Sequence, residues 1–277
     1  MPFDNPFALS ARDYQRLFAA AGYYGGKIDG DIGPKTREAA EKIMGNHPSR
    51  IPGGKLTDAR KLAIAAQLVL HFAGHEPGEI DGYVGHNTAE AFNGWEYERN
   101  HGKREDLGRD ADVFRVDTKA DKAKSDWPRQ KDLMRFYGTV GTNQTRLTFP
   151  YPMRLAWDVK AKVKTTQCHE KVHDAMLGVF TRVYEEYGDD VTKLGLDLWG
   201  GCLNVRKMRG GSSWSTHSWG IAWDIDPANN QLRWNRTRAR LARKEYEAYW
   251  RIVEAAGALS LGRARDFDWM HAQFARL

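Results

Sequence analysis

The sequence contains little cysteine and no long apolar run, and its first residues do not resemble a secretion signal. Cys168 and Cys202 are the only cysteines among 277 residues, so we expect no disulfide framework but two buried thiols in a reducing compartment. No apolar stretch approaches the ~18 residues of a membrane span, so we expect no membrane insertion. Residues 1–6 lack a basic start and an apolar core, so we expect synthesis in the cytoplasm.

The charge balance is only moderately basic. Lys and Arg number 42 against 36 Asp and Glu, a net charge of +6, which favours anionic partners without selecting one. A basic run within residues 236–244 is predicted to be the solvated first half of a helix over 236–257, so we expect no nucleic-acid partner. A length of 277 residues predicts about two domains.

The first third of the chain contains an internal repeat. A shift of 52 residues matches the set Gln15, Ala21, Gly22, Gly26, Ile28, Asp29, Gly30, Gly33, Thr36, Glu38 and Ala39 with Gln67, Ala73, Gly74, Gly78, Ile80, Asp81, Gly82, Gly85, Thr88, Glu90 and Ala91. This self-similarity predicts two copies of a helix–Asp-Gly turn–helix unit, over about 10–44 and 60–96. We expect the glycines to serve backbone geometry. A calcium loop at Asp29 and Asp31 is the alternative, but Tyr83 replaces Asp31 in the second copy.

A charged segment separates two predicted domains. Residues 98–125 are mostly charged or polar and are expected to form a solvated linker. They follow an all-α domain over 1–97 and precede a second domain over 126–277. In the second domain, apolar residues at helical spacing predict a long helix over 165–187.

The second domain contains a segment in which polar groups and apolar residues alternate. From Ile221 to Asp226 every second residue is a large apolar one, which predicts a strand with a buried face. His217 lies just upstream, and Asp224 lies on the strand. Imidazole and carboxylate suit zinc, which usually has three protein ligands in catalytic sites. The carboxyl-terminal segment from Asp266 to His271 offers the third ligand.

These residues carry a resemblance to a known family. The resemblance is to the zinc peptidases of the D-alanyl-D-alanine carboxypeptidase and L-alanyl-D-glutamate endopeptidase family, and it rests on Ser215-x-His217-x-x-Gly220-x-Ala222-x-Asp224 and Trp269-x-His271. That family cleaves peptidoglycan stem peptides and includes many phage endolysins. The resemblance covers roughly residues 126–277 and implies an α+β fold, a small antiparallel sheet with flanking helices that carries a zinc site. Each N-terminal repeat resembles the peptidoglycan-binding module of many wall hydrolases.

The resemblance implies the metal ligands. His217, Asp224 and His271 would bind Zn²⁺ and leave one position for a water, whose pKa zinc lowers towards ~7. Asp226 follows on the same predicted strand face as Asp224, and we expect it to support a ligand or to be solvated.

The resemblance also implies the residues that act beside the metal. Asp268 is expected to be the general base, and Asp266 is the alternative. Arg206 best matches the family's arginine, which stabilises the developing oxyanion, although Arg209 lies only three residues further on.

A competing metal motif lies within the predicted helix over 165–187. His169-Glu170-x-x-His173 places two histidines four residues apart, a spacing that chelates zinc on a helix. Val179 stands where an extended motif would have a third histidine, and Lys171 adds a cation inside the motif. We therefore expect these histidines to cap or pack the helix.

The predicted function is that of a phage-type endolysin that binds peptidoglycan and cleaves its stem peptides. The resemblance favours an L-alanyl-D-glutamate endopeptidase, and a D-alanyl-D-alanine carboxypeptidase or a non-catalytic wall-binding protein remain the alternatives. We expect a monomer that is made in the host cytoplasm and acts on the wall after release.

Overall fold

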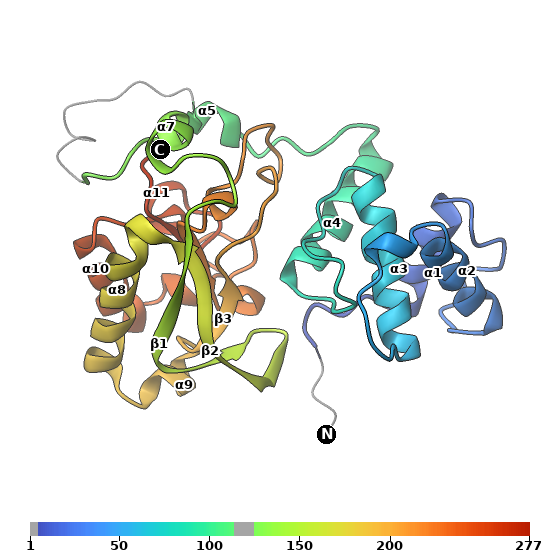
Figure 1. The fold of residues 1–277 in the computed structure, drawn as a ribbon, viewed down its shortest axis with the longest axis horizontal. Helices are drawn as coiled ribbons and strands as arrows, with labels where there is room; N and C mark the ends of the chain where they lie inside the picture. Colours follow the sequence, from blue (N-terminus) through green and yellow to red (C-terminus); the bar gives the residue numbers. More distant parts are fainter. Residues whose placement is uncertain (1–4, 114–124) are drawn as a thin grey trace. The chain divides into compact units, whose positions relative to one another are not determined.

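The computed structural model describes residues 5–113 and 125–277 and divides the chain into two compact units, Met1–Glu105 and Asp106–Leu277 (Figure 1). The described part of the first unit is helical, and the second unit combines a sheet with helices. Each unit encloses its own hydrophobic core, as expected for domains. Within the described ranges, no helix is both long and apolar enough to cross a bilayer.

The N-terminal unit packs its helices around α3. Its elements are α1 (Ala11–Ala20), α2 (Pro34–Gly45), the 3₁₀ turn Pro48–Arg50, α3 (Asp58–Phe72) and α4 (His86–His101). Pro34 occupies the first turn of α2, where its missing N–H removes no helical hydrogen bond. Helix α3 contacts α1, α2 and α4 and is buried along most of its length, so it forms the centre of this unit.

The first repeat closes its turn around a buried glutamine. The Gln15 amide donates to Asp29 Oδ1 at 2.7 Å, and its Oε1 accepts from the Gly30 amide at 2.9 Å. Asp29 Oδ1 also accepts from the Asp31 amide at 3.0 Å. The Asp29 carboxylate therefore bonds within the turn, which supports the geometric interpretation over a calcium loop.

The second repeat makes the same bonds 52 residues later. Gln67 donates to Asp81 Oδ1 at 2.9 Å and accepts from the Gly82 amide at 2.9 Å, while the Tyr83 amide donates to Asp81 Oδ1 at 2.8 Å. Gly30 and Gly82 have φ of 87° and 78°, which glycine adopts without a Cβ clash. The two turns therefore share one hydrogen-bond pattern, and Gly30 and Gly82 serve the backbone geometry in both.

We expect Gln67→Leu to destabilise the N-terminal unit by about 2 kcal/mol or more, because the apolar side chain leaves several buried polar groups of the turn unpaired. Gln15→Leu is the matched variant in the first repeat, since both glutamines are at most 1% exposed. Urea unfolding followed by circular dichroism measures the effect. Unchanged midpoints in both variants would show that the two glutamines do not hold the turns.

The C-terminal unit is built on a six-stranded, mostly antiparallel sheet with the strand order β2-β1-β3-β4-β6-β5. Its strands are β1 (Gln144–Leu155), β2 (Asp158–His169), β3 (Leu198–Gly201), β4 (Ala222–Ile225), β5 (Leu259–Ser260) and β6 (His271–Gln273). Among these six strands, β1 and β3 pair in parallel, and the other neighbours pair antiparallel. The mixed α and β character and the antiparallel sheet agree with the prediction.

Helices and short turns surround this sheet. They are α5 (Arg109–Val113), α7 (Leu133–Tyr137), α8 (His173–Tyr187), α9 (Asp190–Leu194), α10 (Glu247–Ala255), α11 (Leu261–Arg265) and the 3₁₀ turns Gln130–Asp132, Glu170–Val172, Thr216–Trp219, Pro227–Asn229, Arg240–Ala242 and Lys244–Tyr246. Helix α8 packs against β1, and α10 packs against α8 (Figure 1). Cys168 and Cys202 are free and buried, as expected.

The structure corrects two predicted helices. The helix predicted over 165–187 begins only at His173, because Thr165 and Thr166 pair with β1 and extend β2. Both are β-branched, and such residues favour strands. The helix predicted over 236–257 is reduced to α10 (Glu247–Ala255), which two 3₁₀ turns precede.

The structure also differs from the predicted linker over 98–125. Helix α4 continues to His101 and is capped by the left-handed Gly102. Residues 109–113 form α5 of the C-terminal unit, and Arg109 is buried there. Residues 114–124 of the predicted linker lie outside the described residues.

Candidate metal centre

Three segments bring the predicted ligands together. His217 lies on the 3₁₀ turn Thr216–Trp219, Asp224 lies on β4, and His271 begins β6. The antiparallel register of β4 and β6 places Asp224 directly opposite His271. Gly220, with φ of 66°, ends the turn before β4, and a Cβ there would lie 3.1 Å from the His169 nitrogen. Glycine at this position therefore lets the turn that carries His217 pack closely against the end of β2.

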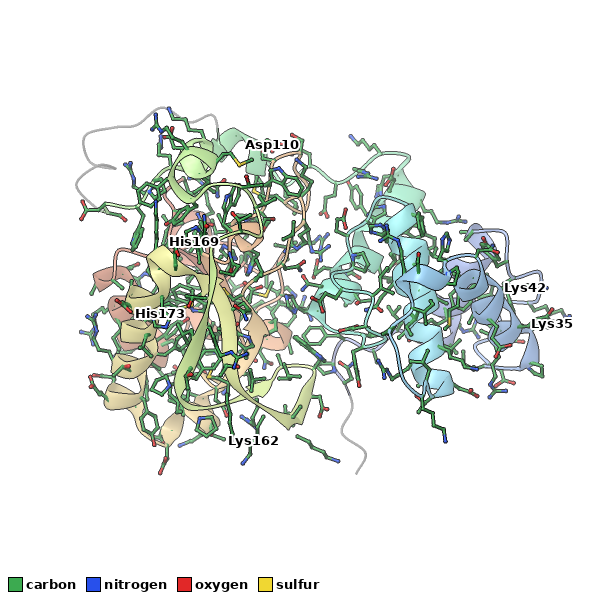
Figure 2. All side chains as sticks on the ribbon, in the orientation of Figure 1. Lys35, Lys42, Asp110, Lys162, His169 and His173 are labelled. Atoms are coloured by element: carbon green, nitrogen blue, oxygen red, sulfur yellow. The ribbon has the colours of Figure 1, made fainter. Side chains whose placement is uncertain are left out.

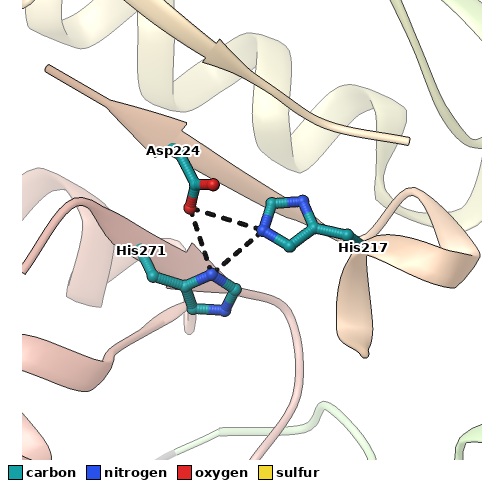
Figure 3. A group of neighbouring side chains, drawn as sticks. All are labelled: His217, Asp224 and His271. Carbon is teal, nitrogen blue, oxygen red and sulfur yellow. Dashed lines mark hydrogen bonds and ion pairs between the residues drawn. The ribbon is translucent and has the colours of Figure 1, made fainter. Parts of the chain in front are cut away.

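The facing atoms of the three side chains form a nearly equilateral triangle (Figure 3). His217 Nε2 lies 3.1 Å from His271 Nδ1, and Asp224 Oδ1 lies 3.3 Å and 3.2 Å from these two nitrogens. Ligands ~2.0–2.1 Å from a tetrahedral zinc lie roughly 3.3 Å apart. The triangle therefore matches one face of a zinc coordination tetrahedron.

In each histidine, the ring nitrogen that points away from the triangle makes a hydrogen bond, and this bond fixes the orientation of the ring. His217 Nδ1 lies 2.6 Å from the Cys202 carbonyl oxygen, and His271 Nε2 lies 3.0 Å from Gln273 Oε1. A carbonyl oxygen accepts only, so His217 carries its proton on Nδ1. Gln273 Nε2 donates to the Ala275 carbonyl at 3.1 Å, so its Oε1 faces His271, and His271 carries its proton on Nε2. This assignment leaves two unprotonated nitrogens and a carboxylate pointing at one another, an arrangement that a cation stabilises.

Burial strengthens the case for a cation. His217, Asp224 and His271 are each at most 4% exposed. Desolvation lowers the pKa of His217, and the charge of Arg206 acts in the same direction, although Asp224 opposes them. The imidazole is therefore kept in the neutral form that binds metal. Across the described residues, this is the one group of three or more His, Cys, Asp and Glu side chains that could hold a metal ion.

Asp268 is buried beside the triangle, whereas Asp266 is not. Asp268 is 3% exposed, and burial raises its pKa even though the charges of His271 and Arg109 oppose this shift. Its Oδ2 lies 3.4 Å from Arg109 Nη1, and its Oδ1 has no hydrogen-bond partner among the described residues. Asp266 instead pairs with Arg236 at 3.0 Å, and its side chain is 35% exposed. Of the two predicted acids, Asp268 is therefore the one that is buried near the three facing side chains.

The remaining predicted residues divide between the site and its surroundings. Arg206 is buried, and its amide donates to Ser218 Oγ at 3.0 Å, next to His217 in the chain. Arg209 is half-buried in the same loop. Asp226 departs from the prediction, because β4 ends at Ile225 and Asp226 adopts a left-handed φ of 48°.

Asp226 is therefore neither a partner of a ligand nor solvated. It is fully buried, accepts from Asn229 at 2.8 Å and pairs with Arg240 at 3.3 Å. Burial raises the pKa of its carboxyl to about 6. The carboxylate stabilises the chain reversal after β4.

The competing histidine motif does not form a metal site. His169 ends β2 and His173 begins α8, so the two do not share a helix face (Figure 2). His169 Nε2 lies 2.8 Å from the Tyr137 carbonyl oxygen, and its Nδ1 accepts from the Lys171 amide at 3.1 Å. His173 pairs with the adjacent Asp174. The expectation that both serve capping and packing is confirmed for His169, which caps the turn before α8.

Sequence reasoning missed Arg109. It lies in a charged, glycine-containing segment in which the nearest apolar residues are Leu107 and Ala111, and this pattern is typical of a linker. Comparisons with family models, with curated proteins and with solved structures gave no match to this chain.

Proposed function

We propose that this protein is a zinc metallopeptidase that hydrolyses peptidoglycan stem peptides in the manner of a phage endolysin. The observation that carries the proposal is the buried triangle of His217, Asp224 and His271, whose atoms are spaced as zinc ligands. The motif resemblance supplies the substrate class. A two-His, one-carboxylate set with an open position is the ligand arrangement of zinc hydrolases.

The chain's own residues fit peptide hydrolysis. When bound, zinc supplies an acidified water and polarises the scissile carbonyl. Asp268 Oδ1, which has no described partner, is available to take up the proton of the attacking water and to deliver it to the leaving amine. A raised pKa suits a group that must carry this proton between the two steps.

The basic side of the site suits a developing negative charge. The guanidinium of Arg206 is close enough to affect the pKa of His217, and it is almost fully buried. A fixed cation in a water-poor site stabilises an oxyanion strongly, because no solvent must reorganise around it. Arg206 is therefore our candidate for oxyanion stabilisation.

The scissile bond is assigned from the resemblance. We favour the L-alanyl–D-glutamate bond, and the alternatives are the terminal D-alanyl–D-alanine bond and wall binding without cleavage. Purified sacculi incubated with the protein and then analysed by mass spectrometry would reveal the new amino and carboxyl ends. New L-alanine carboxyl ends and D-glutamate amino ends support the first choice, released free D-alanine supports the second, and no new ends refute the peptidase proposal.

The N-terminal unit is proposed to anchor the enzyme to the wall. A pocket of about 300 Å³ between its helices is lined by apolar and aromatic side chains, including Tyr23, Phe72 and Trp95. Phe72 is 54% exposed, although His47 stacks on it at 4.2 Å between ring centroids. An exposed aromatic beside a pocket favours a binding surface over a purely structural role.

We expect removal of residues 1–105 to weaken binding to purified sacculi while cleavage of a soluble stem peptide stays within about 2-fold of the full chain. Tethering raises the local substrate concentration without touching the chemistry. Phe72→Ala tests the pocket itself in the full chain, with Tyr83→Ala as a matched control for the loss of an exposed aromatic. Pelleting assays measure binding, and equal binding by all forms would refute the anchor role.

A further inference from the structure

The segment that begins the C-terminal unit is bonded to the loop that carries Arg206. Asp110, which Figure 2 labels, accepts from the Ser212 amide at 2.7 Å and from the Ser213 amide at 3.1 Å according to the interatomic distances. The Leu107 amide donates to the Gly210 carbonyl at 3.4 Å. The Asp110 carboxylate thus joins two segments more than 100 residues apart in the chain.

The loop sequence is adapted to this contact. A Cβ on Gly210 would lie 2.7 Å from Leu107 Cγ, and a Cβ on Gly211 would lie 3.1 Å from Asp110 Oδ1. Gly210 also has φ of 65°. Position 210 therefore requires glycine for two reasons, the left-handed backbone conformation and the close approach of Leu107. Two distant stretches of sequence fit each other, which indicates a permanent contact.

This contact places Arg109 beside Asp268, the proposed general base. The Arg109 side chain is 8% exposed, and its Nη1 lies 3.4 Å from Asp268 Oδ2. The guanidinium also lies 5.6 Å from the centroid of the Phe267 ring, a cation–π distance. Arg109 holds one carboxylate oxygen, and the other, Oδ1, has no described partner.

We propose that Arg109 is a positioning residue, delivered by the Asp110 anchor, that orients the Asp268 carboxylate so that Oδ1 faces the reacting atoms. The effect of this orientation on catalysis rests on the proposed peptidase function. A single ion-pair contact at one oxygen restrains the rotation of the carboxyl group and leaves the second oxygen for proton transfer. Residues 106–113 are then part of the catalytic unit.

The kinetic test uses the full-length zinc protein and a soluble stem peptide. Arg109→Met should lower kcat by roughly 10–100-fold, the usual effect of losing a partner that orients a group at a metal site. KM and zinc content should change by less than about 2-fold, and Arg109→Lys should restore part of kcat. Lys103→Met, which removes an exposed cation nearby in the sequence, is the charge control. A rise in kcat for Arg109→Met would identify an inhibitory contact and overturn the proposal.

A double-mutant cycle separates positioning from general structural support. In an Asp268→Asn background, Arg109→Met should change kcat by less than about 2-fold, because the carboxylate that it orients is absent. An equal loss of kcat in both backgrounds would overturn the proposal. Asp110→Ala should reproduce part of the Arg109→Met effect, since it releases α5 from the loop.

A second readout does not depend on activity. In the metal-free protein, Arg109→Met should lower the Tm by about 4 °C or more, because it leaves a buried carboxylate without its cation. The shift should be clearly smaller in the Asp268→Asn background. An equal Tm shift in both backgrounds would show that Arg109 and Asp268 do not interact, and it would overturn the proposal. If the wild type cleaves no wall peptide, the proposed function fails, and this cycle still decides whether Arg109 holds Asp268.

Discussion

His217→Ala and His271→Ala should each lose bound zinc and peptide cleavage together. Each change removes one of three proposed ligands, so the loss of activity should exceed the roughly 10–100-fold that outer partners of a metal site contribute. The facing atoms lie 3.1 Å apart, and either truncation opens one corner of the triangle. Elemental analysis of the purified variants, followed by a cleavage assay with added zinc, measures both effects.

His173→Ala is the matched control for these variants. Its side chain is 29% exposed and contacts Asp174, so its removal should leave zinc content and cleavage unchanged. Zinc retained by both His217→Ala and His271→Ala would show that the metal binds elsewhere, and the proposed centre would have to be abandoned.

Asp268→Asn should keep zinc and fold normally but cleave a defined stem peptide ~10²–10⁴-fold more slowly, the usual contribution of a general acid–base group. The amide keeps the shape of the side chain but does not take up the proton. Single-turnover cleavage, with zinc content determined first, separates chemistry from binding and product release.

Asp266→Asn is the paired control two residues away. Asp266 bonds to Arg236 at the surface, so this change should cost less than about 3-fold in rate, within the range of a surface substitution. If both variants cleaved at the wild-type rate, proton transfer would have to be assigned to another group. Equal losses in both would point to a folding defect of the shared turn.

The proximity of His217 and Asp224 was predictable, because alternation from Ile221 identified a strand and His217 lies on the short turn that leads into it. His271 comes from β6, and its place opposite Asp224 depends on long-range strand pairing, so only the resemblance indicated it. Asp226 did not follow the same alternation, because the backbone leaves the extended region directly after Ile225.

Long-range pairing explains the features that the sequence did not reveal. Thr165 and Thr166 belong to a strand because they pair with β1. The apolar spacing of α8 extends close to these residues, so the sequence alone did not show where the strand ends and the helix begins. Arg109 is buried because Asp110 meets two amides of a loop more than 100 residues away. A contact of this kind leaves no periodic signal in either segment.

The glutamine-centred turns of the N-terminal unit have a consequence for how its two copies can diverge. In each copy the turn is held by one buried side chain, one aspartate and backbone amides, so the residue after the Asp-Gly pair contributes only its amide and carbonyl. Asp31 occupies that place in one copy and Tyr83 in the other, where Tyr83 is 51% exposed. Because the side chain at this place does not hold the turn, the two copies can differ there in size and charge, and so in the chemistry of their outer surfaces, without loss of the shared fold.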